Sequence, residues 1–244
     1  MALQREYYPS DTLKLINQSE SLVVRNAVLG NATTMGVKDK YVAHTIGRHL
    51  LKGSPGALGL GVPLAEFRDR FLNAPDNVNS AWAGKGEMAI ILCELLNDQA
   101  GQYALGLLDG GVGRVLVHYL NAGKLAALHK NAKFKESIVT VIPASTQLID
   151  VAIMNPKTNQ PVMVNGVPKT VRTSVTTPKQ ASASVKAADI ASVNAVLDCY
   201  GQSSLHLQTF FPSSEMVTSY VEWNVGTLKK VATFDGGFVA VKTL

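Results

Sequence analysis

The chain has few cysteines, few charges and few prolines for its length. Its 244 residues include two cysteines, which can form at most one disulfide and cannot supply the four thiolates of a structural zinc site. Charged residues make up 17% of the chain and hydrophobic residues 46%, a balance that excludes a wholly disordered protein. The 20 glycines and 10 prolines are too few for a collagen-like or low-complexity polymer. We therefore expect a folded protein in a reducing compartment.

Long uncharged apolar runs are also missing. The two most apolar windows, residues 88–96 and 104–120, are interrupted by Glu94 and by Asp109 and Arg114. A membrane-spanning helix needs about 18 uncharged apolar residues, so neither window qualifies. The first residues contain no apolar stretch after their first positive charge, which predicts no secretory signal peptide. A cytoplasmic location without a membrane partner is the expectation.

Motifs for metals and nucleotides are missing as well. The chain has no His-Glu-x-x-His motif, no pair of Cys-x-x-Cys motifs and no acidic calcium loop. Two glycine-rich stretches, residues 56–61 and 110–113, lack the Gly-Lys-Ser/Thr of a phosphate-binding loop. The sequence therefore predicts no metal and no cofactor, and it disfavours a nucleotide-dependent enzyme.

The net charge of +5 is concentrated in one segment. Residues 111–188 contain ten lysines and arginines but only two acidic residues. Such a surplus can form a positive face that attracts phosphates, or it can be a solvated surface that keeps the protein soluble. If the face binds RNA, the candidate contacts are Lys124, Lys130, Lys133, Lys135, Lys169 and Arg172.

Hydrophobic periodicity predicts helices first and strands afterwards. Apolar residues recur at helical spacing from about residue 12 to 24, after Pro63, and from residue 88 to 97. After Gly101 the pattern predicts strands at residues 112–120, 137–142, 147–154, 161–164, 171–176, 195–200 and 204–211, and a pair around residues 235–237. Asn165-Gly166 is a hairpin-turn signal, whereas residues 173–188 have little to bury and predict a mobile loop. We predict an α+β fold with N-terminal helices packed on a largely antiparallel β-sheet.

Two histidines flank an arginine in the stretch from residue 44 to 49. Imidazoles titrate near neutral pH and a guanidinium matches phosphoryl oxygens, so His44, Arg48 and His49 suit acid–base work on a phosphate. On one helix, His44 and Arg48 would share a face, whereas His44 and His49 would not. The alternative is a helix in which His49 packs against the following leucines while Arg48 faces solvent.

A third histidine lies in the predicted strand at residues 204–211. Strict alternation points its two leucines into the core, and it directs His206 and Gln208 to a groove or solvent. A β-bulge would release Thr209 from this alternation. A loop before residue 204 would put Cys199 opposite His206. The two side chains could then form a catalytic thiol–imidazole pair, or they could be ordinary cross-strand neighbours.

Three patches of the sequence occur in an order that resembles a known family. They are residues 44–49, the Asn79-Ser80-Ala81-Trp82 turn that leads into a helix, and residues 205–212. This order resembles the RNA-cleaving toxin domains of bacterial polymorphic and contact-dependent inhibition systems, in the barnase–EndoU–colicin–RelE group. The resemblance implies a nuclease-like α+β domain at residues 40–213. Residues 1–39 would then be an N-terminal helical extension, about 155–188 a basic insertion and 214–244 a C-terminal β extension.

Together with these residues, the resemblance implies a metal-independent ribonuclease. His44 or His49 would withdraw a proton from an RNA 2′-hydroxyl, and His206 would protonate the departing 5′-oxygen, leaving a cyclic phosphate. Arg48 and Thr209 would stabilise the developing charge. Such a site requires the acid and the base to lie within about 10 Å of each other. A cognate inhibitor protein and delivery to a target cell would accompany this function.

Two other functions fit the sequence. One is a non-enzymatic structural or assembly protein of a phage particle or secretion apparatus, whose Ser/Thr/Ala-rich loop orders on a neighbouring subunit. The other is a nucleic-acid-binding module that leaves its substrate intact.

Overall fold

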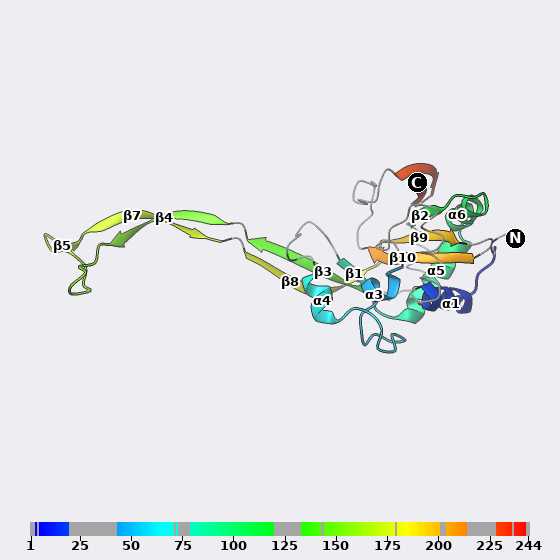
Figure 1. The fold of residues 1–244 in the computed structure, drawn as a ribbon, viewed down its shortest axis with the longest axis horizontal. Helices are drawn as coiled ribbons and strands as arrows, with labels where there is room; N and C mark the ends of the chain where they lie inside the picture. The colour runs from blue at the N-terminus through cyan, green and yellow to red at the C-terminus, as the bar shows by residue number, and fades with distance from the viewer. Residues whose placement is uncertain are drawn as a thin grey trace.

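The computed structural model shows a body of helices and strands from which a long two-stranded arm projects (Figure 1). The structure describes residues 3, 5–19, 43–70, 72, 79–119, 133–142, 144–178, 180–200, 204–213, 228–235 and 237–242. Within this part of the chain the fold is α+β and its sheets are antiparallel, as the sequence predicts.

The body is built on a five-stranded sheet in the order β10-β9-β2-β12-β11. These strands are β2 (Arg114–Tyr119), β9 (Ser192–Tyr200), β10 (Ser204–Ser213), β11 (Leu228–Phe234) and β12 (Gly237–Lys242). The predicted strand pairs around residues 201–203 and 235–237 are confirmed. Because β10 is an edge strand of this sheet, its outer backbone groups can bond to another segment of the chain.

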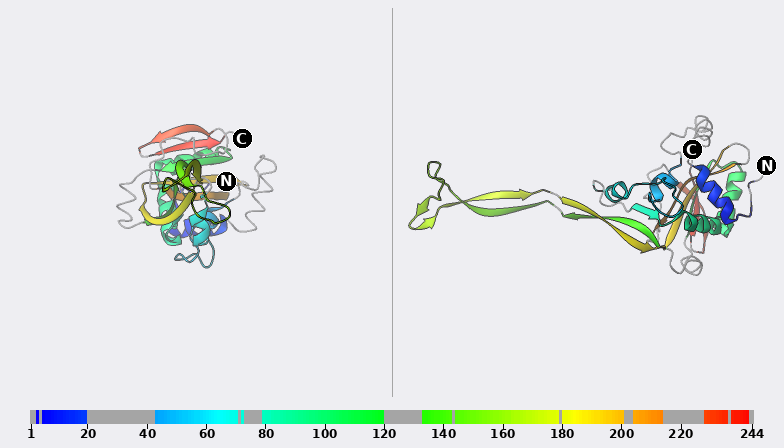
Figure 2. Two further views of the ribbon diagram at one scale, coloured as in Figure 1. Left: turned by 90° about the vertical axis from the view of Figure 1, so that its left-hand side faces the viewer. Right: turned by 90° about the horizontal axis from the view of Figure 1, so that it is seen from below.

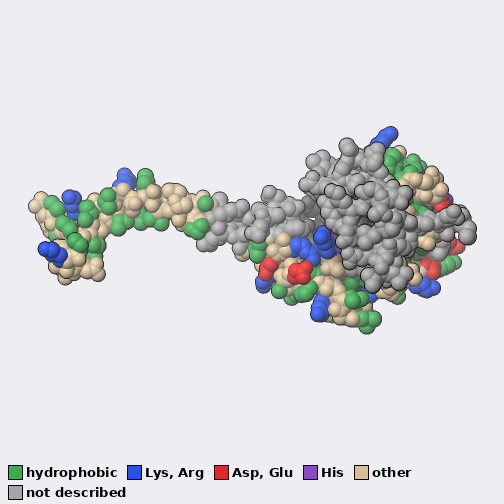
Figure 3. Space-filling model, in the orientation of Figure 1, with side chains coloured by type: hydrophobic (Ala, Val, Ile, Leu, Met, Phe, Trp, Pro, Cys, Tyr) green, Lys and Arg blue, Asp and Glu red, His purple; other side chains and the backbone are tan. Residues whose placement is uncertain are grey.

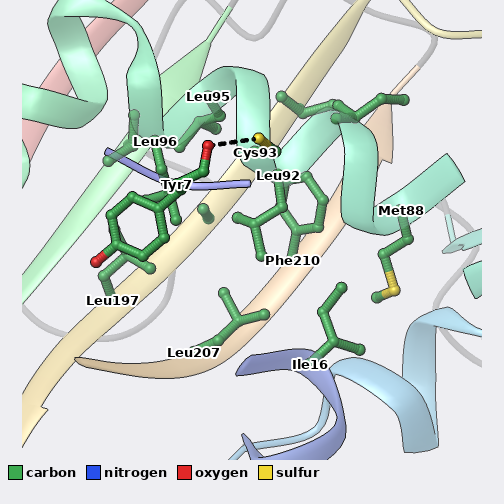
Figure 4. Close-up of a cluster of buried hydrophobic side chains, with 14 of the residues drawn as sticks. Tyr7, Ile16, Met88, Leu92, Cys93, Leu95, Leu96, Leu197, Leu207 and Phe210 are labelled. Atoms are coloured by element: carbon green, nitrogen blue, oxygen red, sulfur yellow. Dashed lines mark hydrogen bonds between the residues drawn. The ribbon is translucent and has the colours of Figure 1, made fainter. Parts of the chain in front are cut away.

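One face of this sheet is covered by helices. They are α1 (Pro9–Ser19), α5 (Lys85–Asn97) and α6 (Gln99–Asp109). Side chains alternate along a strand, so Val115 and Leu197 point toward the helices and join Leu92 in one buried cluster. Figure 4 shows this cluster with Ile16 of α1 and Leu207 of β10 packed near α5. No helix in the described ranges is both long enough and apolar enough to span a bilayer.

Helix α1 begins three residues earlier than the apolar pattern predicts. Pro9 occupies its first position, where a missing N–H costs little. The Asp11 carboxylate accepts a hydrogen bond from the Tyr8 N–H at 3.1 Å and so satisfies a free donor at the helix start. Ile16 is fully buried in the cluster that also contains Val239 of β12. Described residues near both ends of the chain therefore share the core of the body.

Helix α6 occupies a segment that the sequence predicts to be outside the helices. The pattern was wrong here, because the residues around and after Gly101 continue as a helix before β2 begins. Asp98 caps this helix by accepting a hydrogen bond from the Ala100 N–H at 3.2 Å. Ala104 and Leu108 are buried at helical spacing. The cap and this short apolar stripe explain why the segment is helical.

Two short helices lie beside the strand β1 (Asn79–Trp82). They are α3 (Thr45–His49) and α4 (Leu64–Asp69), and the helix predicted after Pro63 is thus confirmed. Phe67 of α4 is fully buried with Leu51 and Val62. A β-bridge joins Leu50, directly after α3, to Trp82 of β1. The bridge fixes α3 against β1 at the side of the body.

The arm consists of two successive pairs of antiparallel strands and a short tip (Figures 1 and 2). At its base β3 (Lys133–Ile142) pairs with β8 (Gln180–Asp189), and β1 adds a third strand to β3. Further out β4 (Ser145–Ala152) pairs with β7 (Thr170–Thr177). At the tip, β5 (Met163–Val164) and β6 (Val167–Pro168) form a hairpin. The tip lies at the far end of the molecule from both termini.

Two sequence expectations for the arm had opposite outcomes. Asn165 and Gly166 have φ angles of 52° and 81°, as a two-residue hairpin turn of type I′ requires, so the predicted turn is confirmed. The mobile loop predicted at residues 173–188 is wrong, because these residues form the end of β7 and most of β8. Cross-strand hydrogen bonds satisfy the backbone donors and acceptors of such a strand even where it packs on no hydrophobic core. The lack of apolar residues therefore misled the prediction.

Candidate active site

A bulge in β10 determines which of its side chains face the core. Leu207 pairs with Leu197 and Thr209 pairs with the next residue, Val196, so Gln208 is an extra residue in the strand. As a result, Leu207 and Phe210 both belong to the helix-covered core. Thr209 and Phe211, on either side of Phe210, then lie on the opposite face. The predicted release of Thr209 by a bulge is confirmed.

The bulge is also where α3 meets the sheet. The His44 N–H donates a hydrogen bond of 2.9 Å to the Gln208 carbonyl, and the Thr45 hydroxyl donates to the same oxygen at 3.4 Å. These contacts join segments more than 160 residues apart in the chain. The early histidine segment and the Gln208–Phe211 part of β10 therefore lie side by side at the sheet edge.

The rings of His44 and His49 lie next to each other. Their centroids are 5.7 Å apart, and the His49 ring stacks on Phe211 with centroids 4.9 Å apart. Both histidines are partly exposed. Helical spacing does not separate them, because His44 is the N-cap of α3 with a non-helical φ of −142° and His49 is its last residue. The structure thus places two imidazoles and a phenyl ring in a row.

His49 is held in one tautomer. Its Nδ1 lies 2.9 Å from the Ser80 carbonyl of β1, which can only accept, so Nδ1 carries the proton and Nε2 carries the lone pair. Burial and the neighbouring His44 lower the pKa of His49 to about 3, although the Ser80 carbonyl opposes this shift. The imidazole is therefore neutral at pH 7 and can act as a proton acceptor.

Strand β1 supports this arrangement from the core side. The Trp82 indole Nε1 donates a hydrogen bond of 2.9 Å to the Phe210 carbonyl, and the two rings stack with centroids 4.8 Å apart. Trp82 is 1% exposed. The Asn79–Trp82 patch of the sequence thus fixes both His49, through Ser80, and the end of β10.

Two guanidinium groups lie beside the histidines. Arg70 donates a hydrogen bond of 3.2 Å to the Arg48 carbonyl, and its other guanidinium nitrogen is 3.6 Å from Glu66. Burial and the nearby Arg48 lower the pKa of Arg70. Arg48 is exposed and has no carboxylate partner in the described ranges. Two cations this close favour the binding of an anion.

Thr209 contributes a buried polar group. The residue is 1% exposed, and its hydroxyl makes no hydrogen bond to any residue that the structure describes. Leaving a buried hydroxyl unsatisfied costs about 1–3 kcal/mol, which makes Thr209 a candidate for a bond to a ligand. Thr209 shares the face of β10 that carries Phe211, the ring stacked on His49.

The structure does not bring His206 into this row. Its ring is buried, with Nε2 3.2 Å from the Ser19 carbonyl and Nδ1 3.6 Å from the Asp198 carboxylate. Asp198 in turn accepts two hydrogen bonds from the buried Arg114. The side chain of His206 is therefore engaged by buried groups and closed to solvent.

The expected juxtaposition of Cys199 and His206 is wrong by one residue. Cys199 lies opposite Leu205, and Asp198 lies opposite His206. The hairpin closes with the Tyr200–Ser204 pair, which sets this register. No thiol–imidazole pair forms across these strands.

Two of the six predicted RNA-binding cations lie in the outer arm, away from the site. Lys169 and Arg172 are exposed in the outer arm, and the Arg172 guanidinium lies 3.9 Å from Asp150. Lys133 and Lys135 are on β3 at the base of the arm. Lys124 and Lys130 lie outside the described residues.

The sequence predicts His44, Arg48, His49 and Thr209 as site residues but overlooks their supports. Ser80 and Phe211 lie within the patches that carry the resemblance and contact His49, whereas Arg70 lies outside them and bonds to the Arg48 carbonyl. These contacts form only when the chain folds. In the described ranges, no group of three or more histidine, cysteine or acidic side chains could hold a metal ion. No family model, curated protein or solved structure matches the chain.

Proposed function

We propose that the chain is a metal-independent ribonuclease whose reacting groups are carried by α3 and β10. The observation that carries the proposal is the pair of imidazoles, His44 and His49, with ring centroids 5.7 Å apart beside two arginines. An acid and a base at this separation can reach opposite sides of one phosphate. The order of the three sequence patches, which resembles RNA-cleaving toxin domains, points the same way.

His49 is the base in this mechanism. Its Nε2 lone pair takes the proton of an RNA 2′-hydroxyl while the 2′-oxygen attacks the adjacent phosphorus. The hydrogen bond to Ser80 keeps the proton on Nδ1, and this fixes Nε2 as the acceptor. A bound phosphodiester carries a negative charge, which opposes the effect of burial and raises the basicity of the ring.

His44 is the acid. As the bond between phosphorus and the 5′-oxygen breaks, His44 delivers a proton to that oxygen, and the products are a 2′,3′-cyclic phosphate and a 5′-hydroxyl. His206, to which the sequence assigns this step, is bonded to the Ser19 carbonyl in a buried environment. His44 is partly exposed and adjacent to His49, so it is better placed for the transfer.

The charge that develops on phosphorus requires donors aimed at its oxygens. Arg48 and Arg70 supply guanidinium groups, which match a phosphate in geometry and charge. The Thr209 hydroxyl, which has no partner among the described residues, donates the further hydrogen bond. Together these groups replace the role that a metal ion has in other nucleases.

The test is cleavage of a short RNA by the purified chain in excess EDTA, with product ends identified by mass. We expect 2′,3′-cyclic phosphate ends, and no cleavage where the attacking 2′-hydroxyl is replaced by hydrogen. His44→Gln and His49→Asn should each slow cleavage by at least about 100-fold, since loss of a general acid or base costs 10²–10⁴. His118→Asn removes a buried imidazole in the central sheet and serves as the matched control.

Two results would overturn the proposal. One is RNA that is bound in a salt-sensitive way but left intact, which identifies a non-cleaving nucleic-acid-binding module. The other is cleavage that persists undiminished when His44 and His49 are both replaced.

A further inference from the structure

A cavity lies between the N-terminal segment, helix α1 and the start of β10. Its volume is about 230 Å³, and its lining includes Leu3, Tyr7, Asp11, Lys14, Leu15 and Leu205. Asp11, Lys14 and Leu15 are spaced at i, i+3 and i+4, so they share one face of α1. In Figure 3, acidic, basic and hydrophobic side chains meet at the lower right of the body, where α1 lies in Figure 1. The cavity therefore combines opposite charges with apolar walls.

The walls of the cavity are held in place by the body of the protein. Leu3 and Tyr7 are 4% and 6% exposed. The Leu3 N–H donates a hydrogen bond of 2.7 Å to the Asp109 carboxylate. The Tyr7 N–H donates to the Asn97 side-chain oxygen at 2.9 Å, and the Asn97 amide nitrogen donates back to the Tyr7 carbonyl at 2.8 Å. A ligand therefore meets a preformed site, and little free energy is lost in ordering it.

The two charged groups of the cavity can each bind a ligand. Lys14 is exposed and forms no ion pair with any residue that the structure describes. Asp11 accepts a hydrogen bond of 3.1 Å from the Tyr8 N–H, and a carboxylate has lone pairs for further bonds. Burial raises the pKa of Tyr7 to about 12, so its hydroxyl keeps its proton at neutral pH. The cavity thus offers an anion and a cation about one helical turn apart.

The size and the charges of the cavity restrict its ligand. Pockets for drug-sized molecules measure about 300–1,000 Å³, so a cavity of about 230 Å³ suits a smaller molecule. A nucleotide would bring its phosphate next to the Asp11 carboxylate, and the like charges would repel each other. A small molecule that carries both charges satisfies Asp11 and Lys14 together. An aliphatic group on the same molecule is removed from water by the leucines of the walls.

We propose that this cavity binds a free α-amino acid with an aliphatic side chain, such as leucine. The ammonium group of the ligand pairs with Asp11, and its carboxylate pairs with Lys14. Its side chain packs against Leu3, Leu15 and Leu205. None of these residues belongs to the proposed ribonuclease site, so the two proposals are independent.

The first test is a calorimetric titration of the full chain with leucine at pH 7. We expect saturable binding with a Kd of about 1 mM or tighter. Glycine, leucinamide and N-acetylleucine each lack one of the three recognised groups, and each should bind at least about tenfold more weakly. Absence of saturable binding up to about 20 mM leucine overturns the proposal. Leucinamide or N-acetylleucine that binds as tightly as leucine also overturns it, because the ligand would then be a peptide end.

The second test changes the two charged groups one at a time. Lys14→Met removes the ammonium group but keeps an unbranched side chain, and Asp11→Asn keeps an oxygen for the Tyr8 N–H. Each should weaken leucine binding at least about tenfold, through loss of a charge-assisted bond. Lys52→Met removes an exposed lysine elsewhere on the body and is the matched control. Circular dichroism checks that each variant is folded, and a folded Lys14→Met chain that binds leucine like the control contradicts the proposal.

Discussion

The body and the arm are both made of antiparallel strands, yet they are stabilised in different ways. In the body, Val115 and Ala195 are completely buried beneath the helices. In the arm, every residue of β7 and all but the last residue of β4 are exposed. Hydrophobic burial therefore stabilises the body, whereas cross-strand hydrogen bonds and side-chain pairs hold the arm. The comparison also separates the two regions, since the candidate site lies in the body and large apolar side chains are exposed on the arm.

The largest loss of stability is expected where two helices of the body touch. A Cβ added to Gly101 would lie 2.0 Å from the Leu95 carbonyl oxygen, a backbone atom that cannot move aside. Gly101→Ala should therefore lower the free energy of unfolding by about 3 kcal/mol or more. Gly106→Ala, at an exposed position of the same helix, is the control and should raise it by about 0.5–1 kcal/mol. Chemical denaturation measures both, and equal effects would contradict the packing of α5 on α6.

An intermediate effect is expected from the neutral His49 of the body. Its pKa is about 3 in the folded protein and 6.5 when unperturbed, so between these values the unfolded chain binds more protons. The free energy of unfolding should therefore fall as pH falls from about 6.5 toward 3. The loss should be about 2 kcal/mol at pH 4 relative to pH 7, reduced from the full linkage value because the ring is partly solvated.

His49→Asn should remove this part of the acid sensitivity. Burial also lowers the pKa of His118, which contributes with the same sign and remains in the variant. Denaturation curves at the two pH values give the difference. A variant as acid-sensitive as the parent chain would show that His49 is not the neutral group described above.

The smallest effect on the body is expected from loss of the outer arm. Joining Ile142 to Gln180 through an Asn-Gly turn keeps β3 paired with β8 and removes β4 to β7. None of the removed residues belongs to a buried cluster of the body. The unfolding free energy should change by less than about 1 kcal/mol, as for surface changes in general. If the shortened chain no longer folded, the division of the molecule into a body and an independent outer arm would be contradicted.

Local signals predicted much of this molecule, and long-range contacts account for what was missed. The stripe of helix α5, the Asn165-Gly166 turn and the β9–β10 hairpin are each specified within about 20 residues, and each is confirmed. The strand β8 is stabilised by a partner strand about 40 to 55 residues away in the sequence, so its own composition predicted a loop. The residues next to β8 in the sequence do not indicate that it pairs with β3.

The candidate site follows the same rule. The motif at residues 44–49 was readable in the sequence, because residue type carries it. The bulge near Thr209 was only one possibility at that stage, because strand alternation alone does not locate a bulge. The burial of His206 depends on Ser19, Asp198 and Arg114, which come from three separate elements. Its side-chain partners could not be foreseen from alternation alone.

The most direct test of the account compares RNA cleavage in EDTA by two variants. One is the arm-shortened chain with Ile142 joined to Gln180, and the other is the full-length chain carrying His44→Gln. The account predicts that the arm-shortened chain cleaves RNA at the same rate as the parent chain. It predicts that the His44→Gln chain cleaves RNA at least about 100-fold more slowly than the parent chain. Cleavage lost with the arm and retained in His44→Gln would contradict it.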